Sequence, residues 1–244
     1  MTGGEVSAVI VVVPVHNEEA LLDRSLTALA AAVATAAGCG IRCAVRIVLD
    51  DCTDGSAAVA GVHPIPTMVL ASARVGEARA QGIEAAKQEL AGTAADRVWI
   101  ANTDADSAVP PNWIVAQSHA AARGADVFVG TVRPDFADLS GPHRRHWLRT
   151  HSPGVPNGHV HGANLGVRAS FYAAAGGFGA LAEHEDVDLV DRCRLLGANI
   201  CASDAAEVLT SGRFVGRTPG GYAGYLRAQA GLVGRRGIRS SPAY

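Results

Sequence analysis

The feature that most constrains the fold is a series of short apolar runs separated by longer helical patterns. The first run, Val9–Val13, consists of β-branched residues and ends at Pro14, which indicates a strand buried on both faces. The other runs predicted as strands in the first half are 44–49, 67–71 and 97–101. One helical pattern opens at Asn17 and stops at Gly38, and another covers 76–90. Strands joined by helices of this length form crossover connections. We therefore expect an α/β domain with a mostly parallel central sheet and helices on both faces.

The second half of the chain is less regular. A helix over 109–123, a strand over 126–132, strand-like alternation over 159–167 and a helix over 186–196 are predicted. The stretch between them, 133–158, is rich in Pro, Gly, His and Arg and is predicted as a long functional loop. Beyond Arg213 arginines accumulate without any acidic residue. We expect one domain over 1–215, with halves 1–107 and 108–215, followed by an arginine-rich helix or tail over 216–244.

Composition limits the class of protein. The 244 residues are 48% hydrophobic and 18% charged, which is enough apolar material for one substantial core. The net charge of −2 argues against a general nucleic-acid binder. The apolar stretch Ala8–Val13 falls far short of the roughly 20 residues of a membrane span, and its flanks do not resemble a signal peptide. The five cysteines are odd in number and scattered, which is typical of reduced thiols. We therefore expect a cytoplasmic protein.

Acidic residues collect where the predicted strands end. Asp50 and Asp51 follow the second strand, and Asp104 and Asp106 follow the fourth. Ligands of open α/β sheets bind at these carboxyl ends. Asp104 and Asp106 project to the same side if the extended conformation continues, and two carboxylates so close repel each other unless a proton or a cation intervenes. A divalent ion such as Mg²⁺ or Mn²⁺ would suit them, whereas a solvated acidic loop is the simpler interpretation of an isolated pair.

Six motifs in a fixed order carry the most specific information about function. They are Val11–Glu19, Asp50–Ser56, Gly76–Gly82 with Arg79, Asp104–Asp106 followed by Pro111–Trp113, His161–Arg168 followed by Gly176–Phe178, and Glu185–Leu189 followed by Arg192 and Gly197. Together they cover roughly residues 8–200 and resemble the motifs of family 2 glycosyltransferases, although Gln81 stands where the family more often has Asn or another small residue. The resemblance implies the GT-A fold of nucleotide-diphospho-sugar transferases and an inverting transfer.

The resemblance assigns the donor nucleotide sugar to the half 1–107. The donor-binding residues that it implies are Pro14, His16, Asn17, Glu18, Asp50, Asp51, Arg79 and Asp104. Asp104 and Asp106 are the implied ligands of the divalent ion, a Lewis acid and template for the departing pyrophosphate. Ser211–Arg213 and Arg217 are expected to close over the donor from the C-terminal side. Simpler interpretations are a surface helix charge for Arg79 and an N-cap of the first helix for Asn17.

The half 108–215 is the implied acceptor half. Asp186 is the candidate general base, which would take the proton of the acceptor hydroxyl, and His161, Asn164 and Glu185 are expected beside it. The acidic cluster 183–188 would otherwise merely stabilise the N-terminus of the following helix. His159 and His161 share a strand face, where polar lining of the acceptor groove is favoured over a metal-binding pair.

These observations predict a metal-dependent inverting glycosyltransferase that moves one sugar from a UDP-, GDP- or TDP-linked donor to an unidentified acceptor. A sugar-1-phosphate nucleotidyltransferase and a non-catalytic nucleotide-sugar-binding module remain alternatives. The former usually has a Gly-rich basic loop after the first strand, and a dehydrogenase would need G-x-G-x-x-G there; Pro14–Glu19 is neither. The arginine-rich end is either solvated or in peripheral contact with anionic lipid.

Overall fold

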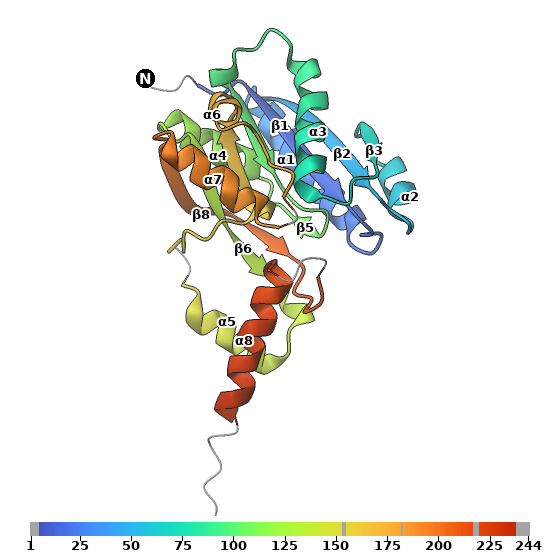
Figure 1. The fold of residues 1–244 in the computed structure, drawn as a ribbon, viewed down its shortest axis with the longest axis vertical. Helices are drawn as coiled ribbons and strands as arrows, with labels where there is room; N and C mark the ends of the chain where they lie inside the picture. Colours follow the sequence, from blue (N-terminus) through green and yellow to red (C-terminus); the bar gives the residue numbers. More distant parts are fainter. Residues whose placement is uncertain (1–4, 153–154, 182, 217–219, 238–244) are drawn as a thin grey trace, which may run out of the picture.

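The described part of the chain forms an eight-stranded sheet with helices on both faces, in a computed structural model that describes residues 5–152, 155–181, 183–216 and 220–237 (Figure 1). The strands are β1 (Ala8–Val15), β2 (Arg42–Asp50), β3 (Thr67–Leu70), β4 (Val98–Asn102), β5 (Ser107–Ala108), β6 (Val127–Pro134), β7 (Leu165–Arg168) and β8 (Ile200–Thr210). The α-helices are α1 (Leu22–Gly38), α2 (Ser56–Gly61), α3 (Val75–Lys87), α4 (Trp113–Ala122), α5 (Gly141–Thr150), α6 (Ala169–Ala174), α7 (Glu185–Leu195) and α8 (Tyr222–Gly237).

The sheet is mostly parallel, as predicted. Its strand order is β3-β2-β1-β4-β7-β6-β8-β5. The first four strands of the chain run parallel, while β7 runs antiparallel to both β4 and β6, so that β6 and β8 again point the same way as β1. The carboxyl ends of β1, β2, β4, β6 and β8 therefore meet at one edge of the sheet, where ligands of such sheets bind.

Strand β1 is buried on both faces because it lies between two apolar layers. Val9, Val11 and Val13 pack in the core that includes residues of α1 and α4, whereas Ile10 and Val12 pack in the core that includes residues of α3 and α7. The predicted double burial of the Val9–Val13 run is thus confirmed, and it explains why the run needs no polar positions.

Several elements differ from the prediction. The stretch 133–158 is not a continuous loop, since it contains the end of β6 and helix α5. Of the predicted strand 159–167, the structure shows β7 from Leu165 onward, preceded by a 3₁₀ turn over Gly162–Asn164. Helices α2 and α6 and strands β5 and β8 fall where no element was predicted. Helix α8 lies inside the predicted C-terminal segment, while 217–219 and 238–244 are outside the described residues.

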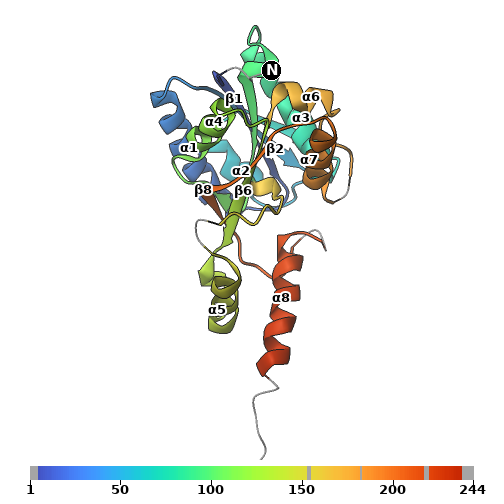
Figure 2. The same ribbon diagram turned by 90° about the vertical axis from the view of Figure 1, so that its left-hand side faces the viewer.

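Helices α5 and α8 extend together from the carboxyl edge of the sheet, away from the rest of the molecule (Figures 1 and 2). Residues 135–140 connect β6 to α5, and α8 is the helix that follows β8 along the chain. No helix in the described residues is long and apolar enough to cross a membrane.

Candidate active site

A cleft of about 650 Å³ opens at the carboxyl edge of the sheet. It brings together residues from both halves of the chain, among them Pro14, His16, Glu18, Arg79, Asp104, Asp106, His161, Glu185, Asp186, Arg213, Tyr222 and Tyr225. The two aspartates of the predicted metal pair and the predicted base therefore share one cavity. The local sequence does not predict that these three residues come together, because their proximity depends on how the fold places the loop after β4 relative to α7.

Arg79 links the two sides of the cleft. Its side chain is 2% exposed; Nη2 lies 2.6 Å from Asp104 Oδ1, and Nε lies 3.3 Å from Glu185 Oε1. Nη1 donates to the carbonyl of Gly162 at 3.2 Å. Burial by itself would lower the pKa of Arg79, but Asp104, Glu185 and Asp186 outweigh it and raise that pKa. The surface-charge interpretation of Arg79 is thus wrong.

The charged form of Asp106 is disfavoured by its surroundings. Its side chain is 16% exposed, and Oδ2 lies 3.1 Å from Arg213 Nη2. Oδ1 accepts from the Ser107 hydroxyl at 3.1 Å. Burial, and then the charge of Asp104, raise the pKa of Asp106 to about 6, although Arg213 acts in the opposite direction. A cation bound beside Asp106 would relieve this cost.

The carboxylates of the cleft fit a divalent ion that is bound together with a phosphate-containing substrate. Among the described residues no three His, Cys, Asp or Glu side chains are grouped as a complete metal cage. Mg²⁺ typically takes one or two protein carboxylates and completes its shell with phosphate oxygens and water. Asp104 and Asp106, both in the cleft, supply that number of carboxylates.

Arg213 links the loop after β1 to the loop after β4. Its Nη1 donates to Glu18 Oε2 at 2.8 Å, and its Nη2 donates to Glu18 Oε1, so the pair is bidentate. The same Nη2 contacts Asp106. The sequence indicated that 211–213 closes over the donor side, but it held no sign that Glu18 is the partner, since the two residues are 195 positions apart.

Asp186 lies in the first turn of α7, inside the cleft. Its Oδ1 accepts from the N–H of Val187 at 2.8 Å. The preceding residue, Glu185, is 5% exposed, and burial raises its pKa although Arg79 counteracts this. His184, which has a left-handed backbone (φ 61°), turns the chain into the helix. Of the two neighbouring acids, Asp186 is thus the one that Arg79 does not neutralise by direct contact.

Three residues expected on the donor side do not line this cleft: Asn17, Asp50 and Asp51. The carboxylate of Asp50 accepts from the backbone N–H groups of Ser72, Ala73 and Arg74 at 2.8 to 3.0 Å, and from the Ser72 hydroxyl. The hydrogen bonds that the Asp50 carboxylate accepts thus come from the loop after β3.

Asn17 is not the N-cap of α1, which begins at Leu22 after Leu21. It adopts a left-handed backbone with φ 54°, whereas an N-cap residue is normally extended. Its Oδ1 accepts from the N–H groups of Thr53 and Asp54, at 2.7 and 3.3 Å. Asn17 therefore connects the loops that follow β1 and β2.

Asn164, expected on the acceptor side, lies in the core. It is 0% exposed, and its Oδ1 accepts from Trp113 Nε1 at 2.8 Å. Its Nδ2 donates to the carbonyls of Thr131 and Ala206, at 2.9 and 2.8 Å. These bonds join α4, β6 and β8, so the structure gives this residue a packing role.

The histidines of the 159–161 segment line the cleft beside the first turn of α8. The ring centroids of His159 and His161 are 6.3 Å apart, and His161 meets Tyr222 edge-on at 5.7 Å. Burial, and then His159, lower the pKa of His161 to about 4, so its imidazole is neutral at pH 7. Tyr222 and Tyr225 stack at 5.8 Å and continue this aromatic wall.

The sequence model of a known family, Glycosyl transferase family 2, matches residues 10–174, which is well over half of the chain. The chain belongs to glycosyl transferase family 2. Its fold is similar to that of the mannosyltransferase PcManGT from Pyrobaculum calidifontis, solved in complex with GDP-Man and Mn²⁺: the TM-score is 0.60 at 19% identity, over 97% of this chain and 65% of that one. It is also similar to S. aureus TarS, with a TM-score of 0.57 at 15% identity, over 96% of this chain and 40% of that one.

These similarities confirm the predicted GT-A type fold of this family 2 chain. A structure of TarS residues 1–349 in complex with UDP gives a TM-score of 0.53 at 14% identity, over 96% of this chain and 67% of that one. The chain spans about two thirds of the length of the mannosyltransferase and two fifths of TarS. A search of curated proteins found no match.

Proposed function

We propose that this chain is a metal-dependent inverting glycosyltransferase that moves one sugar from a nucleotide-diphosphate sugar to an acceptor hydroxyl. The observation that carries the proposal is the presence of Asp104, Asp106 and Asp186 in one cleft. Family membership supports sugar transfer, and GDP-Man and UDP in the similar structures support a nucleotide-diphosphate donor. The free cysteines are in keeping with a reducing, cytoplasmic compartment.

The donor side of the cleft would hold the nucleotide and its diphosphate. Pro14, His16 and Glu18 line it from the end of β1, and His16 Nδ1 donates to the carbonyl of Asp50 at 2.7 Å, which orients its ring. Asp104 and Asp106 would hold a Mg²⁺ or Mn²⁺ ion, which when bound would act as a Lewis acid on the leaving diphosphate. Arg79 holds the Asp104 carboxylate in place.

The acceptor side would supply the proton acceptor. The acceptor oxygen bonds to the anomeric carbon as the bond from that carbon to the diphosphate breaks, and the hydroxyl proton passes to the Asp186 carboxylate. A single displacement of this kind inverts the configuration at the anomeric carbon. A positioned general base typically contributes about 10²–10⁴-fold to the rate.

The test is Asp186→Asn, measured with UDP-, GDP- and TDP-sugars and Mn²⁺, with nucleotide release and donor binding followed in parallel. We expect transfer, or hydrolysis when water is the acceptor, to fall by about 10²-fold or more, with donor affinity preserved. Asp188→Asn, on the same helix but outside the cleft lining, is the matched control. Transfer at the wild-type rate by Asp186→Asn would refute the base assignment. Formation of a nucleotide sugar from a nucleoside triphosphate and a sugar 1-phosphate would favour a nucleotidyltransferase instead.

A further inference from the structure

Charge is divided unevenly along this chain. Two stretches contain arginines and no acidic residue: 139–182 carries Arg144, Arg145, Arg149 and Arg168, and 208–244 carries Arg213, Arg217, Arg227, Arg235, Arg236 and Arg239. They leave 11 of the 21 basic residues, but all 23 acidic residues, to the rest of the chain. The net charge of −2 is thus the sum of two basic segments, 139–182 and 208–244, and a strongly acidic remainder of the chain.

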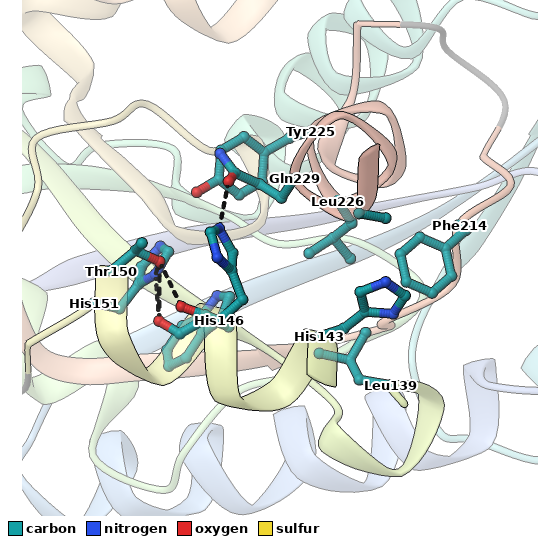
Figure 3. A pocket seen from close by; sticks show the side chains of 11 residues that line it. Leu139, His143, His146, Thr150, His151, Phe214, Tyr225, Leu226 and Gln229 are labelled. Carbon is teal, nitrogen blue, oxygen red and sulfur yellow. Dashed lines mark hydrogen bonds between the residues drawn. The ribbon is translucent and has the colours of Figure 1, made fainter. Parts of the chain in front are cut away.

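The structure places parts of these two segments side by side, at one end of the molecule. They include α5 and α8, which extend together from the carboxyl edge of the sheet (Figures 1 and 2). His146 Nε2 and Gln229 Oε1 are 2.7 Å apart, and Tyr225 and Leu226 face α5 across a cavity of about 20 Å³ (Figure 3). Trp147 is 8% exposed. The pair is therefore a packed unit.

The outward face of α5 is basic with an apolar residue in its middle. Arg144, Arg145, Leu148 and Arg149 are exposed, Leu148 to 49%, while His146 and Trp147 are buried. At 100° per residue the four exposed side chains span one continuous arc of the helix. None of the three arginines forms an ion pair with another described residue, although Arg144 lies 5.1 Å from the centre of the Phe136 ring.

We propose that the α5 face docks on the surface of a lipid bilayer that contains anionic phospholipids. Arginines beside an exposed leucine suit the boundary between headgroups and acyl chains, where the charges meet phosphates and the apolar side chain leaves water. The acidic remainder of the chain would be repelled by the same surface, which orients the molecule with α5 and α8 toward it. Because Tyr222 and Tyr225 of α8 line the cleft, docking would hold the cleft near the headgroups. This proposal stands apart from the transfer reaction.

The test is cosedimentation of the full chain with vesicles of phosphatidylcholine alone and of phosphatidylcholine with phosphatidylglycerol. We expect binding to the anionic vesicles, weakened by added salt. Replacing Arg144, Arg145 and Arg149 with Gln should lower the affinity by about 10²-fold, since each arginine near such a surface contributes roughly fivefold. Leu148→Gln should weaken binding to the anionic vesicles as well.

The matched control removes the same charge from the opposite edge of the sheet. Arg42, Arg97 and Arg123 are exposed and lie at or just before the amino ends of β2, β4 and β6, so their replacement with Gln should leave vesicle binding nearly unchanged. Equal losses in the two triple variants, equal binding to neutral and anionic vesicles, or no binding to either would overturn the proposal. So would equal binding to a single-stranded oligonucleotide with no effect of Leu148→Gln. If the triple variant has a lowered Tm, the single variant Arg149→Glu is used instead, because it reverses a charge at an exposed helix end. It should also weaken binding to the anionic vesicles, and unchanged binding would overturn the proposal.

Discussion

At the scale of single residues, Arg213 determines the charge balance around Asp106. Its guanidinium pairs with Glu18 and lies 3.1 Å from Asp106 Oδ2, which is where positive charge is needed. A bound divalent ion would compete with Arg213 for Asp106. Removing the arginine therefore leaves a more negative site for the ion.

We expect Arg213→Gln to bind Mn²⁺ more tightly than the wild type in the absence of donor, by about tenfold, because a nearby positive charge is lost. The measurement is titration of free Mn²⁺ by electron paramagnetic resonance. Arg194→Gln is the control: Arg194 also lines the cleft, but it pairs with Asp191. A weaker Mn²⁺ affinity in Arg213→Gln would show that the arginine supports the metal site.

His161 gives a pH dependence with a defined sign. Its folded-state pKa of about 4 lies below the usual 6.5, so the unfolded chain binds more protons between these values, and folding stability falls as the pH drops below 6.5. Asp106, whose pKa is raised to about 6, acts in the opposite direction over part of this range. A comparison of the wild type with a His161 variant isolates the histidine.

We therefore expect Tm to fall more from pH 7 to pH 5 in the wild type than in His161→Gln, by a few degrees, since 1 kcal/mol corresponds to about 2–4 °C at this size. His143→Gln is the control, because the His143 side chain is only partly buried. Parallel pH profiles of the wild type and His161→Gln would contradict the assignment.

At the scale of elements, the approach of α3 to the sheet positions Arg79. A Cβ at Gly82 would lie 2.6 Å from Val12 Cγ1 and 2.7 Å from Val48 Cγ2. Gly82 therefore lets the helix lie directly on β1 and β2, and it sets how far Arg79 reaches into the cleft from the preceding turn.

We expect Gly82→Ala to lower stability by about 1–3 kcal/mol through overpacking, which corresponds to a fall in Tm of several degrees by thermal unfolding. Gly61→Ala is the matched control, because a Cβ at Gly61, in α2, meets nothing within 4 Å. Its stability should be unchanged or slightly raised. If both variants kept the wild-type Tm, the close packing of α3 on the sheet would not contribute to stability in the way proposed.

Elements whose own sequence is strongly periodic could be predicted, and elements that depend on a distant partner could not. Strand β1 follows from its continuous run of β-branched residues, and helix α1 follows from the helical pattern that stops at Gly38. Helix α5 has only two buried residues, the consecutive His146 and Trp147, so its sequence lacks a helical apolar stripe. It packs on α8, which lies far along the chain. Strand β8 contains Asp204 and Glu207, which interrupt the alternation by which a strand is recognised.

At the scale of the whole molecule, ligand binding should raise the free energy of unfolding. A donor and metal ion that bind only the folded state add about 2.7 kcal/mol at a hundredfold excess over Kd, or a rise in Tm of about 5–10 °C. We expect this rise with the preferred nucleotide diphosphate and Mn²⁺ together, measured by thermal unfolding. Asp106→Asn should abolish the part that requires Mn²⁺, whereas Asp188→Asn should retain it. A rise that persists in Asp106→Asn would place the metal elsewhere.

The sequence by itself determined the class of fold and the edge of the sheet where the cleft lies. Apolar periodicity is local, and parallel strands joined by helices bring their carboxyl ends to one edge. The tertiary structure decided which polar side chains reach that cleft. Asp50 and Asn164 are turned away from it by hydrogen bonds to distant backbone groups, while Arg213 is drawn in by Glu18. A polar side chain takes its role from its partners, and these partners lie far along the chain and are brought near by folding alone.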